Sequence, residues 1–305
     1  MTRKPFHRPR SESRSAILAT LLIISSMSHV AAGDAVTGQE QISPAMDQDL
    51  VRFDSAGSRP YDYEVRLARE RGEPLEIAHG YPIQGYLTKP RGNGPFPAVL
   101  LLHSCNGASA TRRSVANVVA GWGYVGPFVD DYTTRGFTEG CKTRFTEGLS
   151  DAFGALLFLS KLPFVDTKRV GVVGFSQGAE TALNIASTRL DSAFDVPGDL
   201  RFRIAVAFYP PCRGSAGRLN MPTRIFVGDE DSTTPATDCE RFMERQSNNP
   251  ADIKLVVYPG ANHGFDNPSL ADGKRLFGMW LKYDATAAKD SYVQMREFLA
   301  AKLGD

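Results

Sequence analysis

A serine between two glycines stands where an apolar run ends and a helical pattern begins. Residues 170–178 read VGVVGFSQG, with Ser176 at the centre of a G-x-S-x-G pattern. In a turn of this kind the serine hydroxyl projects from a sharp bend between a buried strand and a helix, and the glycines let the two elements approach closely. Because the bend needs a strand before it and a helix after it, the segment predicts a sheet whose strands alternate with helices.

Apolar runs and helical patterns alternate along the rest of the chain. The expected buried strands are residues 98–102, 124–129, 170–173, 204–208, 223–227 and 254–258, with helical patterns at 152–159 and 292–299 and a hairpin between 75–79 and 84–88. This alternation indicates an α/β fold with a mostly parallel central sheet and helices on both faces. The sequence contains no internal repeat and no interdomain linker, so we expect residues 60–305 to form one domain.

The first 32 residues have the pattern of a secretory signal peptide. Five basic residues and one acidic residue precede the apolar stretch 16–24, and the segment ends in Val30-Ala31-Ala32. A membrane-anchoring helix is the alternative, but nine residues at about 1.5 Å each cannot cross about 30 Å of hydrocarbon. We therefore expect export to the periplasm or beyond, no membrane span after cleavage, and a flexible polar leader over residues 33–59.

The composition excludes several classes of protein. With 42% hydrophobic and 23% charged residues the chain is neither disordered nor fibrous. Lys+Arg 35 and Asp+Glu 34 nearly balance, so no basic surface for nucleic acid is expected. No C-x-x-C pair occurs, and we expect no metal site and no cofactor. The sequence does not indicate an oligomeric state.

A nucleophilic serine requires a base, and the base requires a carboxylate that orients it. In this fold the three follow in the order serine, acid, histidine. Of the five histidines only His263 lies downstream of Ser176, in a glycine-rich turn after the last expected strand. The acid should follow the strand at 223–227, where Asp229, Glu230 and Asp231 compete.

Backbone N–H groups should stabilise the charge that develops on a substrate carbonyl oxygen. One is the N–H of Gln177, which directly follows the serine, and the other should come from the loop after the strand at 98–102. Cys105 is the expected donor in that loop. We expect His103, in the same loop, to brace the backbone rather than to transfer protons.

These segments together resemble the dienelactone hydrolase family of α/β-hydrolases. The resemblance covers about residues 75–303 and rests on the elbow at 174–178, the GxxDxxxP segment at 228–235, the HGF turn at 263–265 and the LLHSCNG loop at 101–107. In that family the acid lies three residues after the glycine that ends the strand and four before a proline. The resemblance therefore implies that Asp231 is the orienting acid.

The chain departs from the founding members of the family at two positions. They carry a cysteine nucleophile where this chain has Ser176, and a glutamate that tunes the cysteine where this chain has Ser104. A serine with a histidine base suits ordinary carboxylic esters or lactones as small-molecule substrates, cleaved through an acyl-enzyme. Two alternatives stay open: the same triad could cleave amides or peptides, or the scaffold could be a non-catalytic binding protein.

Four cysteines and two arginines complete the list of candidate site residues. The expected positions in neighbouring loops favour the disulfides Cys105–Cys141 and Cys212–Cys239, and free buried thiols are the alternative. Arg135 and Arg144 follow the strand at 124–129 and could hold a substrate carboxylate, as arginines do in the resembling family. The alternative for both arginines is a solvated or ion-paired loop.

Overall fold

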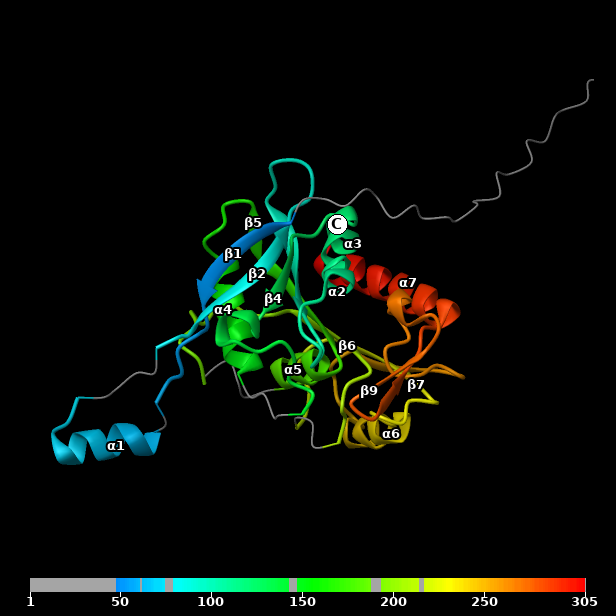
Figure 1. The fold of residues 1–305 in the computed structure, drawn as a ribbon. Coiled ribbons are helices and arrows are strands. Elements are labelled where there is room, and N and C mark those ends of the chain that lie inside the picture. Colours follow the sequence, from blue (N-terminus) through cyan, green and yellow to red (C-terminus); the bar gives the residue numbers. More distant parts are fainter. Residues whose placement is uncertain are drawn as a thin grey trace, which may run out of the picture. The chain divides into compact units, whose positions relative to one another are not determined.

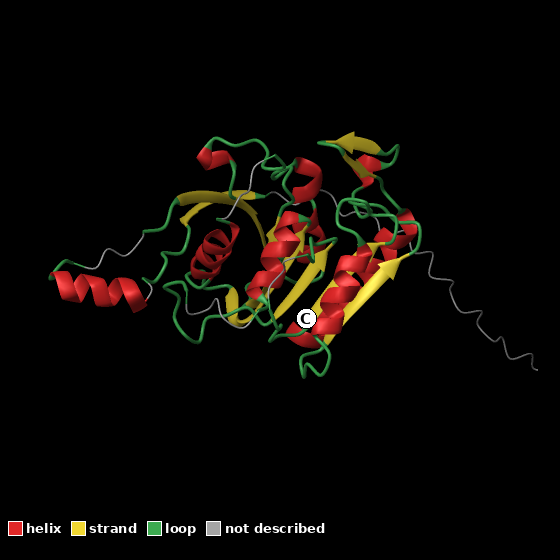
Figure 2. Cartoon of the chain, turned by 90° about the horizontal axis from the view of Figure 1, so that it is seen from below, coloured by secondary structure: helices red, strands yellow, loops and turns green. Residues whose placement is uncertain are grey.

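The centre of the fold is an eight-stranded sheet in the order β1-β2-β4-β3-β5-β6-β7-β8 (Figures 1 and 2). The computed structural model describes residues 48–60, 62–74, 79–142, 147–187, 193–213 and 217–304. The strands are β1 (Asp49–Asp54), β2 (Pro82–Thr88), β3 (Phe96–Leu102), β4 (Gly126–Asp130), β5 (Val165–Phe175), β6 (Ile204–Phe208), β7 (Thr223–Gly228) and β8 (Ile253–Tyr258). All pairs from β4 to β8 are parallel, and β2 is antiparallel to both β1 and β4. This confirms the predicted α/β class.

Helices cover both faces of the sheet, as the sequence predicted. One face carries α4 (Gly148–Leu159), α5 (Gln177–Ile185) and α6 (Ala236–Arg245), and the other carries α3 (Val115–Gly121) and α7 (Ala285–Leu303). Successive residues of a strand point to opposite faces. In β3, accordingly, Leu100 packs in the first core cluster and Leu101 in the second. Strands apolar on both faces therefore read as continuous hydrophobic runs.

The leader predicted over residues 33–59 is wrong in its last part, because β1 lies there. Val51 and Phe53 of this strand pack against the core, and the Phe53 ring stacks on Phe158 of α4 at 5.1 Å between centroids. The α4 glycine at this contact, Gly154, has no room for a side chain, since a Cβ would lie 2.3 Å from the carbonyl oxygen of Asp54. A short edge strand with alternating charged residues has a weak apolar signal, which explains the error.

The hairpin predicted between residues 75–79 and 84–88 is also wrong. Strand β2 does occupy 84–88, but β1 and β4 pair with it on its two sides. Residues 75–78 lie outside the described residues, as do the predicted signal peptide and the start of the leader, up to residue 47.

The remaining elements connect or extend this core. They are α1 (Asp62–Arg71), which has no buried residue, α2 (Ala110–Arg113), the 3₁₀ turns η1 (Thr133–Arg135) and η2 (Pro268–Leu270), and a separate hairpin of β9 (Lys274–Leu276) and β10 (Met279–Leu281). Residues 42–305 form one unit by their contacts. In the described part of the chain, no helix is both long and apolar enough to span a bilayer.

The carboxyl ends of the parallel strands meet at one edge of the sheet, where their loops come together. The loops after β7 and β8 touch: a Cβ on Gly228 would lie 2.0 Å from the carbonyl oxygen of Ala261, and the N–H of Glu230 donates to that same oxygen at 3.1 Å. This contact brings the acids that follow β7 next to the histidine turn that follows β8.

Candidate active site

Ser176 occupies a strained turn between β5 and α5. Its backbone has φ 52° and ψ −112°, a conformation that residues with a side chain rarely adopt. A Cβ on Gly174 would lie 2.0 Å from the carbonyl oxygen of Gly178, and a Cβ on Gly178 would lie 2.4 Å from that of Leu102. The glycines of the G-x-S-x-G pattern are therefore required because backbone meets backbone on both sides of the serine.

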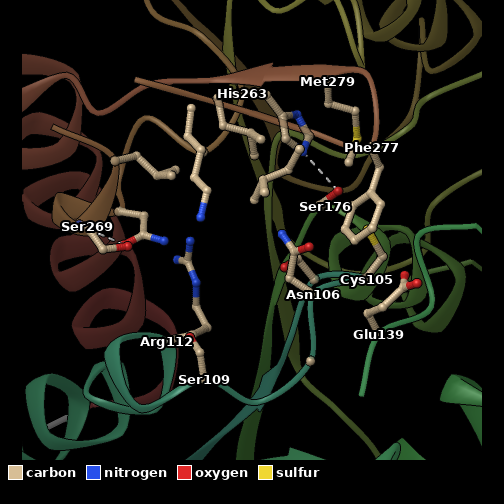
Figure 3. Close-up of a pocket in the computed structure, with 18 of the residues that line it drawn as sticks. Cys105, Asn106, Ser109, Arg112, Glu139, Ser176, His263, Ser269, Phe277 and Met279 are labelled. Atoms are coloured by element: carbon tan, nitrogen blue, oxygen red, sulfur yellow. Dashed lines mark hydrogen bonds between the residues drawn. The ribbon is translucent and has the colours of Figure 1, made fainter. Parts of the chain in front are cut away.

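A continuous line of contacts runs from this serine through a histidine to an aspartate. His263 Nε2 lies 3.0 Å from Ser176 Oγ, and His263 Nδ1 lies 2.7 Å from Asp231 Oδ2. All three side chains are buried, and Figure 3 shows the histidine ring turned toward the hydroxyl. The structure thus brings together the serine, the histidine and one of the three acids that the sequence left in competition.

The surroundings of Asp231 keep its carboxylate charged although it is buried. Oδ1 accepts hydrogen bonds from the N–H groups of Thr233 and Thr234 at 2.8 and 2.9 Å, and Oδ2 accepts one from the Thr234 hydroxyl at 2.8 Å. Burial by itself raises the pKa of Asp231, but the contacts with His263 and Thr234 outweigh it and hold this pKa below its usual value. An ionised Asp231 can accept the Nδ1–H of His263, which leaves Nε2 free to accept a proton.

The two competing acids point elsewhere. Asp229 and Glu230 are exposed, and Asp229 Oδ1 accepts a hydrogen bond from the N–H of Gly260 at 2.6 Å. Asp229 therefore ties the loop after β7 to the turn after β8 but does not contact His263 in any described interaction.

The loop after β3 lies against the serine and carries one of two disulfides. The structure contains both predicted bridges, Cys105–Cys141 and Cys212–Cys239. The first bridge joins the β3 loop to the segment after η1, and the N–H of Gly140 donates to the Cys105 carbonyl at 2.7 Å. These contacts hold in place the backbone whose Cys105 N–H is a predicted oxyanion donor.

A buried ion pair between His103 and Asp131 holds the same loop in place. His103 Nε2 lies 2.6 Å from Asp131 Oδ1, and its Nδ1 lies 2.7 Å from the carbonyl of Ser104, which can only accept. Burial opposes the charge on this imidazole, but Asp131 and the Ser104 carbonyl raise the pKa of His103 above its usual 6.5. His103 does not line the pocket around Ser176. It braces the loop, as predicted.

Arg112 is a site residue that the sequence analysis missed. Its guanidinium forms a buried ion pair with Asp266 and a hydrogen bond of 3.0 Å to the Tyr209 hydroxyl, which donates to Asp266 at 2.6 Å. Burial opposes its charge, yet Asp266 and Tyr209 raise the pKa of Arg112 above its usual value. The network ties the helix after the β3 loop to the His263 turn. No local sequence motif indicates this network, because its members lie far apart in the sequence.

Arg135, a candidate for holding a substrate carboxylate, is ion-paired in this structure, which was the stated alternative. Its guanidinium pairs with Asp151 through two contacts of 2.8 Å and donates to the carbonyl of Asp131 at 2.6 Å. A buried carboxylate in α4 thus takes the arginine away from the pocket, whose lining does not include it. Arg144 lies outside the described residues.

A pocket of about 380 Å³ opens above the serine. In Figure 3, Ser176 and His263 stand between two kinds of wall: Arg112 and Ser269 lie on one side, and Phe277 on the other. Among the described residues, no cluster of three or more histidine, cysteine or carboxylate side chains could hold a metal ion. The groups gathered here can supply a nucleophile, a base and an orienting acid.

The His103–Asp131 pair makes stability depend on pH. Because the pKa of His103 is higher in the folded state, its contribution to stability is complete below about pH 6.5 and is lost as the pH rises through the raised value. Urea unfolding between about pH 6 and pH 9 should show a steeper loss of unfolding free energy in the wild type than in His103→Gln. The exposed His79→Gln should follow the wild type. Parallel curves for His103→Gln and the wild type would contradict the charged pair.

The comparisons with known proteins agree with this geometry. Residues 83–303 match the model of the Dienelactone hydrolase family. A protein of Synechocystis sp. named "Putative carboxymethylenebutenolidase" is 26% identical over 260 residues, which are 79% of this chain and 98% of that protein. Among solved structures, a "Putative Dienelactone Hydrolase" of Klebsiella pneumoniae has a TM-score of 0.60 at 19% identity and covers 83% of this chain and 99% of its own.

A thermophilic esterase of Thermogutta terrifontis has the same fold, with a TM-score of 0.57 at 19% identity over 72% of this chain and 88% of its own. Likeness at this identity shows the fold. The family match spans most of the sheet and every element that carries the serine, the acid and the histidine. The chain therefore belongs to the dienelactone hydrolase family and is a hydrolase.

Proposed function

We propose that the chain is an exported serine hydrolase that cleaves carboxylic esters or lactones through an acyl-enzyme. The observation that carries the proposal is the unbroken line of contacts from Ser176 through His263 to the charged Asp231, at a pocket wide enough for a small molecule. A nucleophile, its base and the group that orients the base in this geometry are the parts that acyl transfer needs.

In the proposed reaction His263 acts first as a base and then as an acid. Nε2 takes the proton of Ser176 Oγ while that oxygen bonds to the substrate carbonyl carbon. The N–H groups of Gln177 and Cys105 donate to the oxyanion of the tetrahedral intermediate. When the intermediate collapses, the bond to the leaving alcohol breaks and His263 returns the proton to that oxygen. Water then attacks the acyl carbon while His263 takes a proton from it. The bond between the acyl carbon and Ser176 Oγ breaks, His263 returns the proton to Oγ, and the acid product leaves.

The names of related proteins support an ester or lactone as substrate. A Bradyrhizobium protein named "Probable 2-oxo-3-(5-oxofuran-2-ylidene)propanoate lactonase" is 23% identical over 203 residues. The Thermogutta terrifontis esterase has been solved with propionate and with butyrate bound, and it is phosphorylated by paraoxon. Small acyl groups and a nucleophile that reacts with organophosphates fit the serine mechanism proposed here.

Export is the second part of the proposal. The signal-peptide pattern of residues 1–32 and the two disulfides both fit an oxidising compartment, since disulfides rarely persist in the cytosol. Protein recovered from the cell that makes it should begin at Gly33, and mass analysis without reduction should detect no free thiol. A protein that keeps Met1, with four cysteines open to alkylation, would contradict export.

The assignment of Asp231 can be tested against its neighbour. In the serine-protease triad, loss of the acid costs about 10⁴ in kcat because the imidazole takes the wrong tautomer. Asp231→Asn should therefore lower kcat for a nitrophenyl ester by a factor approaching roughly 10⁴. Its retained amide oxygen can still accept from the N–H groups of Thr233 and Thr234, so the thermal midpoint should change little.

Asp229→Asn is the matched control, two residues away and of the same chemistry. Its side-chain oxygen can still accept from the N–H of Gly260, so kcat should stay near the wild-type value. A crippled Asp229→Asn beside a normal Asp231→Asn would reverse the assignment.

A further inference from the structure

The hairpin of β9 and β10 stands outside the main sheet and is attached to the catalytic histidine turn. The N–H of Lys282 donates to the carbonyl of His263 at 3.2 Å, and Leu281 forms a parallel bridge with His263. Gly264, at φ 75°, lies against the Leu281 side chain. The base of the hairpin is thus fixed to the backbone of the proposed base.

One face of the hairpin lines the pocket and the other does not. Leu276 pairs with Met279, and Lys274 pairs with Leu281. Because side chains alternate across a strand, these four share one face, and all four line the pocket. The pair between them, Arg275 and Trp280, belongs to the opposite face and is absent from the lining. On the pocket face, a lysine lies beside a leucine at the base, and both side chains nearer the tip are apolar.

Phe277 forms the tip of the hairpin in a left-handed backbone conformation that is unfavourable for an aromatic residue. The pairing of Leu276 with Met279 leaves Phe277 and Gly278 as a two-residue turn, with φ 51° and 83°. Turns with both φ values positive favour Asn-Gly, and an aromatic residue there is strained. The turn therefore gives no reason for a phenylalanine, whereas the pocket does, since Phe277 lines it although the side chain is 43% exposed.

The tip also contacts the segment that carries the first disulfide. Lys142 Nζ lies 5.3 Å from the centroid of the Phe277 ring, within the range of a cation–π contact. Lys142 directly follows Cys141, whose disulfide to Cys105 joins it to the loop beside Ser176. The ring therefore reaches from the histidine side of the pocket to its disulfide side.

The pocket extends to both sides of the nucleophile. Figure 3 shows the polar side chains of Ser109, Arg112 and Ser269 to one side of Ser176. Phe277 and Met279 lie to the other side, where the carboxylate of Glu139 also lies. An ester bound with its carbonyl at the serine would extend one of its two substituents toward the polar wall and the other toward the hairpin.

We propose that the β9–β10 hairpin forms a subsite for an apolar substituent of the ester, and that Phe277 is the specificity-determining residue that limits its length. The inference rests on the proposed function. Leu276, Met279 and Leu281 supply the apolar wall, and the Phe277 ring closes its end. A longer chain would have to displace the ring.

The test uses Phe277→Asn, because Asn-Gly is the favoured sequence for this turn and the hairpin should persist without the ring. The full chain is assayed on two series, nitrophenyl esters of lengthening acyl chain and acetate esters of lengthening alcohol. In an apolar pocket a single methylene changes kcat/KM by about 10–200-fold. The ratio of kcat/KM for the longest to the shortest ester should rise by about tenfold or more in one series only. Phe277→Trp should lower the ratio in that series.

Arg275→Ala is the matched control, on the same hairpin but on the face turned from the pocket, and its ratios should equal the wild type's. Ratios within twofold of the wild type for Phe277→Asn in both series, equal rises in both, or an equal shift in Arg275→Ala would each overturn the proposal. Ser176→Ala distinguishes the underlying mechanism: if it turns over esters as the wild type does, the proposed function fails, whatever the ratios show.

Discussion

The turn at Ser176 carries the chain from β5 into α5 within one residue, and the rest of the site is arranged around it. Only glycines at 174 and 178 let strand, helix and the β3 loop meet closely enough for this turn, because a Cβ at either would overlap backbone atoms. A positive φ at a residue with a side chain costs free energy, and surrounding structure must hold it. The hydrogen bond from the Ser176 N–H to the carbonyl of Phe208 in β6, at 2.9 Å, helps to do so. The hydroxyl therefore projects from a rigid support.

The other loops are held at that hydroxyl by buried charges that are individually compensated. Asp266 fixes the His263 turn to Arg112, and Asp131 fixes the β3 loop through His103. A buried charge that loses its partner destabilises a protein by about 3–5 kcal/mol, so each pair strongly favours one arrangement of its loop. The Ser176–His263 contact differs from these pairs. It joins a neutral hydroxyl to a ring nitrogen that can accept its proton, and both of its residues line the pocket.

A feature of the fold or of the site could be predicted from the sequence where the residues that determine it lie close together along the chain. The strand at 204–208 and the turn at Ser176 were predicted correctly, because an apolar run and a G-x-S-x-G pattern each span only a few consecutive residues. Both disulfides were paired correctly, since strand order places their loops together. The ion pair of Arg135 was expected only as an alternative, and its partner, Asp151, was not predicted because a helix 16 residues away contributes it. The Arg112–Asp266 pair spans 154 residues, and no sequence pattern connects its members.

The hairpin at residues 274–281 was not predicted, because its local sequence signal is weak. Its strands have three residues each, and its turn carries a phenylalanine where a turn signal would place asparagine. The hairpin helps to shape the pocket and was not predicted, whereas the elements that carry the proposed chemistry were predicted. A family of hydrolases can vary its substrates in this way, since side chains on added loops change the pocket while the elbow stays in place.

Reaction with a fluorophosphonate tests the central claim most directly, because the reagent bonds far faster to a serine that a neighbouring base has activated than to an ordinary serine. Intact-mass analysis of the folded protein should show one adduct per chain, and peptide mapping should place it on Ser176. The adduct should be absent in Ser176→Ala and should form far more slowly in His263→Ala. A folded wild-type protein that stays unlabelled, or an adduct on another serine, would contradict the account.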